Sequence, residues 1–152
     1  MKVSTLLDSK GKDVFSVDCS KTIEDAISIM GERKISAIIV TENGKPAGIF
    51  TERDVVRSYL ATKGRSFKEI KVCDHMITNL ITASPDEDVN NIAATMVEKN
   101  IRHLPVKHDD RIVGMLSARD IIQATVKKLK SDNKYLKGYI TGTISPLGHD
   151  ED

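Results

Sequence analysis

Cysteine is scarce in this sequence, and long apolar runs are absent. Only Cys19 and Cys73 occur among the 152 residues, which excludes a disulfide framework and a CxxC metal motif. Apolar runs such as 37–40 are far shorter than the roughly 20 residues of a membrane-spanning helix. The first residues also lack the apolar core of a signal peptide. These absences predict a cytoplasmic protein that has no membrane partner.

An excess of charge of one sign is also missing. The 23 basic residues nearly balance the 22 acidic ones, whereas proteins that bind nucleic acids usually carry a strong basic excess. Nucleic acid is therefore not an expected partner. The length suffices for one compact domain and is too short for two domains of ordinary size.

The dominant feature that is present is an internal repeat. A shift of 66 positions aligns residues 4–60 with residues 70–126 without a gap. Apolar character is kept at many positions, and the identical pairs include Met30/Met96, Gly48/Gly114, Arg53/Arg119 and Asp54/Asp120. We infer a duplication, with repeat 1 over 4–60, a linker over 61–69, repeat 2 over 70–126 and a polar C-terminal tail over 127–152.

Each repeat is predicted to fold in the order strand, helix, strand, strand, helix. The first helix of each repeat has apolar residues at helical spacing, and Thr22 and Asp88 stand where N-caps belong. Asn43-Gly44 predicts a hairpin turn, and Asp109-Asp110 occupies the equivalent place with weaker turn chemistry. In the tail, residues 138–142 suggest a short extended segment.

These elements predict an α+β fold in which two pseudo-symmetric β-α-β-β-α repeats pack through their sheets. A repeat of about 57 residues is near the lower size limit for a stable core, so the two copies are expected to stack. Stacked sheets create a seam lined by equivalent residues. A gap along such a seam is a natural binding cleft.

A hydroxyl residue, an arginine and an aspartate open the last helix of each repeat. Residues 48–54 read Gly-Ile-Phe-Thr-Glu-Arg-Asp, and residues 114–120 match them. One interpretation of this block is a capping box. In that case Thr51 or Ser117 caps the helix, and the acid three residues later bonds back to the N-cap backbone.

A second interpretation of the same block is a nucleotide site. Arg53 and Arg119 lie in the first helical turn, where the helix dipole disfavours a cation unless an anion docks there. Free N–H groups at a helix N-terminus bind phosphate. Asp54 and Asp120 can accept hydrogen bonds from a ribose diol, as acids do in dinucleotide-binding folds. The alternative for each arginine is a solvated surface side chain.

At this block the chain resembles the cystathionine-β-synthase (CBS) domain family, in the tandem arrangement called a Bateman module. The resemblance covers residues 4–126 and rests on the repeat, the element order, the two Gly-h-h-Ser/Thr-x-x-Asp blocks and the segment Ile-Arg-His-Leu-Pro-Val at 101–106. It implies a regulatory sensor that binds AMP, ADP, ATP or S-adenosylmethionine between its repeats. It also implies a homodimer that signals to an unidentified regulated protein.

The resemblance also implies roles for individual residues around the cleft. Asp54 and Asp120 would hold ribose, while Thr51 and Ser117 would approach ribose or phosphate. Other positions correspond to those that pack the adenine in this family, and their alternative role is ordinary core packing. These positions are Val14, Phe15, Ile35, Leu80, Ile81 and Ile101.

The two repeats differ at the strand that enters the cleft. Arg102 and His103 fall where members of the family often place phosphate-binding cations, although a solubilising edge strand, favoured by Pro105, is the alternative. Their counterparts Ser36 and Ala37 carry no charge. We keep Ser36 among the candidate binding residues, and we expect one strong site and one weak or empty site.

Two further questions concern partners and competing functions. The resemblance implies dimer contacts through helix faces, yet the same residues could instead fill the core: Val55, Val56, Tyr59, Leu60, Ile121, Ile122, Thr125 and Val126. A structural or interaction module with a vestigial cleft is the alternative function, and the uncharged Ser36 favours it. The sequence offers no catalytic base, P-loop or metal-carboxylate motif, so we predict no enzyme activity, catalytic cofactor or metal site.

Overall fold

The computed structural model describes residues 1–140 as a mixed α+β fold. Helices and hairpins alternate in the order that the repeat predicts, with one additional helix at the start. The elements are α1 (Val3–Lys10), β1 (Ser16–Asp18), α2 (Ile23–Arg33), β2 (Ala37–Glu42), β3 (Lys45–Thr51), α3 (Glu52–Ala61), η1 (Phe67–Glu69), η2 (Val72–Asp74), α4 (Val89–Lys99), β4 (His103–His108), β5 (Arg111–Ser117) and α5 (Ala118–Ile140).

The predicted N-caps of the first helix in each repeat are confirmed. Thr22 forms a capping box with Asp25 at the start of α2, and the Asp88 side chain accepts a hydrogen bond from the Asn90 N–H at the start of α4. Capping satisfies backbone N–H groups that have no partner inside the helix. Local sequence therefore sets both helix starts.

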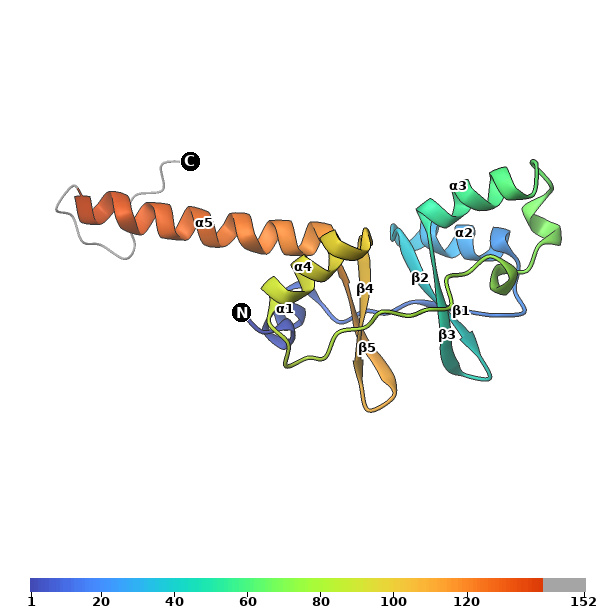
Figure 1. Ribbon diagram of the computed structural model, residues 1–152, viewed down its shortest axis with the longest axis horizontal. Coiled ribbons are helices and arrows are strands. Elements are labelled where there is room, and N and C mark those ends of the chain that lie inside the picture. The colour runs from blue at the N-terminus through green and yellow to red at the C-terminus, as the bar shows by residue number, and fades with distance from the viewer. Residues whose placement is uncertain (141–152) are drawn as a thin grey trace.

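Both predicted hairpins form, and their turns use left-handed residues. Asn43 and Gly44 have φ values of 54° and 77°, while Asp109 and Asp110 have φ values of 48° and 62°. Two successive residues with positive φ are the requirement of a type I′ turn, which suits the twist of paired strands. Figure 1 shows the two hairpins, β2–β3 and β4–β5, next to each other in the middle of the molecule.

The first strand of repeat 2 is reduced to a single bridge. Repeat 1 has the three-stranded sheet β1-β2-β3, whereas repeat 2 has only β4 and β5 and the isolated bridge between Ala83 and Val106. In repeat 1 the Ile39 N–H donates to the Phe15 carbonyl at 3.1 Å. Pro105 occupies the equivalent position and has no N–H to donate, so the parallel ladder cannot extend.

The N-terminal segments of the two repeats are exchanged between two hydrophobic cores. The repeat 1 core, around α2 and the sheet β1-β2-β3, includes Ile70 and Val72 from the start of repeat 2. The repeat 2 core, around α4 and β4–β5, includes Val3, Leu6 and Leu7 from α1. In Figure 1, α1 accordingly lies next to α4 and away from β1–β3. Each core is completed by the other repeat.

The last helix is longer than the repeat requires. α5 runs without a break from Ala118 to Ile140 and projects past α1 and α4 in Figure 1. The extended segment predicted at 138–142 is therefore wrong for 138–140, because the lysine- and leucine-rich stretch before it favours a continued helix; positions 141 and 142 lie outside the described residues. None of the helices in residues 1–140 combines the length and apolar character of a bilayer-crossing segment.

Candidate ligand-binding cleft

A cleft with a volume of about 1150 Å³ lies between the two repeats. It is lined by residues from the start of α3 and α5, from the strands β2 to β5 and from the segments before β1 and after η2. Every residue that the sequence predicts for a binding site lines this cleft: Val14, Phe15, Ile35, Ser36, Thr51, Arg53, Asp54, Leu80, Ile81, Ile101, Arg102, His103, Ser117, Arg119 and Asp120.

The floor of the cleft is apolar and belongs to neither core. Ala37 and Ile49 are buried in a separate cluster, and Val14 and Leu80 pack against it from the two repeats. Ala37 and Ile49 lie on β2 and β3, while Val14 and Leu80 lie in the segments before β1 and after η2. A flat heteroaromatic ring is the kind of group that such an apolar surface accepts, because burying apolar area is favourable.

Thr51 and Asp54 form a complete capping box at the start of α3. The Thr51 N–H donates to Asp54 Oδ2 at 2.9 Å, and the Asp54 N–H donates to Thr51 Oγ1 at 3.4 Å. The second carboxylate oxygen, Oδ1, is paired with the Arg57 guanidinium. The side chain of Asp54 is only 4% exposed. Both oxygens of Asp54 are thus occupied by groups at the start of its own helix.

Ser117 and Asp120 repeat the box at the start of α5 with one difference. The Ser117 N–H donates to Asp120 Oδ2 at 2.8 Å, and the Asp120 N–H donates to Ser117 Oγ at 3.1 Å. Lys10 Nζ donates to the same Oδ2 at 2.7 Å. Oδ1 therefore makes no hydrogen bond within residues 1–140. Because the Asp120 side chain is 17% exposed, this oxygen can accept hydrogen bonds from a molecule in the cleft.

The surroundings of Asp120 keep its carboxylate charged. Partial burial raises the pKa of Asp120, but the hydrogen bonds from Lys10 and Ser117 outweigh burial and hold the net pKa below its ordinary value. The Lys10 ammonium, which also donates to the Met115 carbonyl, is fixed beside it. An anionic acceptor and a cationic donor consequently stand together at this end of the cleft.

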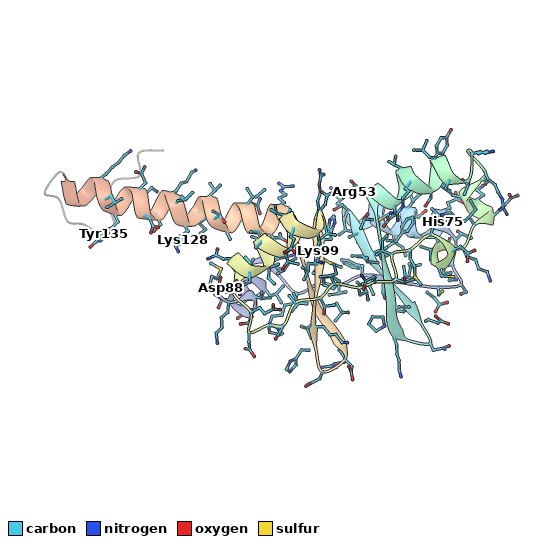
Figure 2. All side chains as sticks on the ribbon, viewed as in Figure 1. Arg53, His75, Asp88, Lys99, Lys128 and Tyr135 are labelled. Atoms are coloured by element: carbon cyan, nitrogen blue, oxygen red, sulfur yellow. The ribbon has the colours of Figure 1, made fainter. Side chains whose placement is uncertain are left out.

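Polar contacts tie the two repeats together across the cleft. Arg53 Nη1 donates to the carbonyl of Asn100, the C-cap of α4, at 2.9 Å, and Figure 2 shows Arg53 where the two repeats face each other. A cation is favourable at a helix C-terminus. This contact explains the position of Arg53 without a bound anion, so the arginine has a structural role in addition to any binding role.

His103 forms the second polar contact between the repeats, and its surroundings favour the neutral imidazole. Its Nε2 lies 2.6 Å from Ser36 Oγ. Burial lowers the pKa of His103 and outweighs the neighbouring acids Glu52 and Asp120, which raise it. As a ligand contact, His103 would therefore act as a neutral hydrogen-bonding group rather than as the cation that the resemblance implies.

The charge around the cleft is nevertheless positive on balance. Six lysines and arginines line it against four acidic residues. Two of the cations, Arg102 and Arg119, are exposed, and their guanidinium groups make no hydrogen bond or ion pair among the described residues. Guanidinium groups of this kind bind phosphate and carboxylate well. The cleft is therefore suited to an anionic ligand with an apolar ring.

Sequence reasoning missed several lining residues, including Lys10, Asp13, Lys34, Asn79 and Asn100. The repeat itself carried a signal for four of them. Asp13 and Asn79 are equivalent under the 66-residue shift, as are Lys34 and Asn100, and each pair flanks candidate residues. Lys10 had no such signal, because its partner Asp120 is 110 residues away in the sequence.

Comparison with known proteins places both repeats in one family. A family model for the CBS domain matches residues 10–61 and 68–127. The mitochondrial CBS domain-containing protein CBSX3 of Arabidopsis thaliana is 35% identical over 149 residues, covering 92% of this chain and 72% of that protein. The CBS-domain containing protein ATU1752 from Agrobacterium tumefaciens has a similar crystal structure, with a TM-score of 0.77 and 32% identity over 82% of this chain and 92% of that chain.

A similar domain pair was solved with ligands. The CBS domain pair of the protein MJ0100, in complex with 5'-methylthioadenosine and S-adenosyl-L-methionine, matches with a TM-score of 0.74 and 28% identity. The match covers 84% of this chain and 98% of that chain. The similarity thus extends over both repeats and over the seam between them.

Proposed function

This chain belongs to the CBS-domain family, and on that premise we propose that it is a regulatory module that binds an adenosine-type ligand between its repeats. AMP, ADP, ATP and S-adenosylmethionine are the candidate ligands. The bound state would be passed to a separate partner protein, and the chain itself would be non-catalytic. A cytoplasmic location is part of this proposal; the mitochondrial relative offers the alternative.

The observation that carries the proposal is the free oxygen of Asp120. Its Oδ2 closes the capping box, while Oδ1 has no partner within residues 1–140, and Asp120 lines the cleft. A carboxylate has enough lone pairs to cap a helix and still accept from a vicinal diol. Ribose bound at Oδ1 would place its adenine toward the apolar floor and its charged substituent toward the cations.

The two repeats would not contribute equally. Asp54 is buried and has both oxygens engaged, whereas Asp120 retains one. We therefore place the strong site at Asp120 and the weak or empty site at Asp54. Because Asp54 is buried and both of its oxygens are engaged, the repeat 1 side of the cleft fits the alternative function, a structural module with a vestigial cleft. This argument does not apply to the repeat 2 side.

Signalling would follow from preferential binding to one arrangement of the repeats. Arg53 and Ser36 of repeat 1 contact Asn100 and His103 of repeat 2. A ligand that inserts beside these ties binds one relative orientation of the repeats better than another. Such a ligand shifts the population toward that orientation, and the partner protein would respond to the change.

Calorimetry with a panel of AMP, ADP, ATP, S-adenosylmethionine and GMP tests the binding function. We expect heat of binding for at least one adenosyl compound and none for GMP. At a concentration 100 times its dissociation constant, the bound compound should stabilise the fold by about 2.7 kcal/mol. Absence of both heat and stabilisation across the panel would leave the structural module as the function.

Capping and ligand binding are separated by a matched pair of variants. Asp120→Ala should abolish binding and lower the free energy of unfolding by about 1 kcal/mol, the usual value of a capping interaction. Asp25→Ala removes the same N3 acid from the capping box of α2, which does not line the cleft. The second variant should lose stability and keep full affinity.

We further propose that exposed apolar residues on α3 and α5 contact a second copy of the chain. Ile121 is buried in the repeat 2 core and Val55 packs against the repeat 1 core, so we do not assign them to the dimer contact. Their neighbours on α3 and α5 are strongly exposed, with Leu60 at 70%, Val56 at 62% and Ile122 at 61%. Val56 and Ile122 occupy equivalent positions of the two repeats, as do Leu60 and Val126, which is 45% exposed, and this pattern suits a two-fold symmetric contact.

Analytical ultracentrifugation tests the homodimer. The unmodified protein should sediment as a dimer, and the double variant Leu60→Glu/Ile122→Glu should sediment as a folded monomer because charges at the contact are unpaired. Val97, which is 83% exposed on α4, gives the control Val97→Glu, which should remain dimeric. A monomeric unmodified protein at all concentrations would contradict the proposal.

A further inference from the structure

The two cysteines of the sequence, 54 positions apart, are brought together by the fold. Cys19 directly follows β1, and Cys73 lies in η2. Between them, the residues that follow Cys19 pair in antiparallel fashion with the residues that precede Cys73. The Ile23 N–H donates to the Ile70 carbonyl at 2.9 Å, and the Val72 N–H donates to the Lys21 carbonyl at 2.8 Å. This short ladder fixes the two segments side by side.

The antiparallel pairing of Thr22 with Lys71 brings Cys19 next to Cys73. The hydrogen bond with the Cys73 thiol, together with partial burial, raises the pKa of Cys19 to about 11. Both residues are free cysteines of intermediate exposure, and Cys19 packs against the repeat 1 core. A thiol that keeps its proton is a poor nucleophile, so Cys19 is not expected to react first with an oxidant.

The segment that holds Cys73 leads directly to the cleft. Four residues later, Ile77 pairs with Ile49 in an isolated bridge, and Leu80 and Ile81 line the cleft. Cys19 is anchored in repeat 1 by the hydrogen bond from its N–H to the Thr41 carbonyl at 2.7 Å. A covalent bond between the two sulfurs would tie the start of repeat 2 to repeat 1 just before the cleft wall.

We propose that Cys19 and Cys73 form an oxidation site at which glutathione disulfide produces an intramolecular disulfide. The Cys73 thiolate attacks one sulfur of glutathione disulfide, breaks its S–S bond and releases one glutathione. The Cys19 sulfur, after losing its proton to water, attacks the Cys73 sulfur and releases the second glutathione. Two electrons pass from the cysteines to glutathione disulfide, and two protons end on the two glutathione thiols.

The test is to equilibrate the full-length protein, without nucleotide, in buffers of increasing oxidised-to-reduced glutathione ratio. The free thiols are then alkylated, and the intact mass and peptide map are measured. We expect a monomeric chain that is lighter by two hydrogen atoms, carries no alkyl group and links the Cys19 peptide to the Cys73 peptide. Dithiothreitol should restore two alkylatable thiols.

Single variants and a melting experiment sharpen the result. Cys19→Ser and Cys73→Ser should each lose the internal disulfide and keep the melting temperature of the reduced protein. Oxidation should raise the melting temperature of the unmodified protein, because a pre-aligned disulfide restricts the unfolded chain. The proposal is overturned if glutathione adducts or disulfide-linked dimers accumulate instead, if both thiols stay alkylatable, or if oxidation lowers the melting temperature. None of these readouts depends on nucleotide binding.

Discussion

Lys10 is the residue at which the structure adds most to the sequence. Its ammonium bonds to Asp120 Oδ2 and to the Met115 carbonyl, and it thereby joins the end of α1 to the start of α5. In the absence of ligand, Lys10 balances the charge of the carboxylate that would hold ribose. The same cation stands where the charged substituent of a bound nucleotide would approach.

Replacing Lys10 by methionine should therefore discriminate between charged and neutral ligands. A hydrogen bond to a charged group is worth about 1.5–3 kcal/mol, so Lys10→Met is expected to weaken AMP binding roughly tenfold or more. Adenosine, which has no phosphate, should bind unchanged or more tightly. Calorimetric titration of both ligands measures the difference, and equal losses for the two would contradict the assignment.

The matched control is Lys12→Met. Lys12, two residues after Lys10, pairs with Asp8 at 2.9 Å, yet it does not line the cleft. Its replacement removes one positive charge from the molecule without removing a neighbour of Asp120. The affinities for AMP and adenosine should both stay as they are in the unmodified protein.

His103 should make stability depend on pH in a predictable direction. Because burial lowers its pKa in the folded protein, the unfolded chain binds a proton more readily just below pH 6.5. The contribution of His103 to the free energy of unfolding is therefore complete above the pKa of the histidine in the unfolded chain. It is lost as the pH falls toward the pKa of the histidine in the folded protein. Urea unfolding at pH 7.5 and pH 5.5 should show this loss, and His103→Gln should reduce it; an equal loss in the variant would assign it to other groups.

At the scale of elements, the glycines in the middle of β3 and β5 show why equivalent positions are not interchangeable. A Cβ on Gly48 would lie 2.6 Å from the Ile77 carbonyl oxygen, whereas a Cβ on Gly114 would lie 2.7 Å from a methyl group of Leu7. The first obstacle is backbone that belongs to the Ile49–Ile77 bridge. The second is the end of a side chain that can rotate.

Gly48→Ala is accordingly expected to destabilise the protein more than Gly114→Ala. Overpacking against backbone costs about 1–3 kcal/mol, while Leu7 can adopt another rotamer at lower cost. Chemical denaturation of both variants measures the difference in the free energy of unfolding. The order would be reversed if the contact of β3 with the segment after η2 were loose.

The sequence predicts individual elements well where the signal is local. The caps at Thr22 and Asp88 and the turn at Asn43-Gly44 are set by side chains within a few residues, and all three form. The first strand of repeat 2 is missing because Pro105 has no N–H to donate to a neighbouring strand. The helical course of residues 127–140 depends on a polar stretch that has no strong pattern. The first outcome depends on a contact between segments that are distant in the sequence, and the second on the helix propensity of the lysines and leucines in that stretch.

At the scale of the whole molecule, the exchange of N-terminal segments makes the stability of each repeat depend on residues of the other repeat. Leu7 is 3% exposed in the repeat 2 core, although it belongs to the start of the chain. Leu7→Ala should lower the free energy of unfolding by about 2–5 kcal/mol through the cavity that it leaves. The control Val97→Ala, at a residue that is 83% exposed, should change it by less than about 0.5 kcal/mol. A small effect at Leu7 would mean that α1 is only loosely docked.

The cleft itself was predictable because duplication places equivalent residues along one seam. The blocks at 48–54 and 114–120 led to Asp54 and Asp120, and both lie in the cleft. What the sequence cannot encode locally is which aspartate is left with a free oxygen. That difference comes from Arg57 at one helix and from Lys10 at the other. Lys10 is 110 residues away from Asp120 in the sequence.

Because each repeat completes the core of the other, neither half of the chain is expected to fold without the other half. A chain cut within 61–69 would yield one fragment with an apolar α1 and nothing to cover it, and another whose interior lacks Val3, Leu6 and Leu7. The first fragment would in turn lack Ile70 and Val72. Neither piece could have served as a free-standing ancestor in its present form. Complementation of the two pieces, rather than independent folding of either, is how this architecture would reassemble.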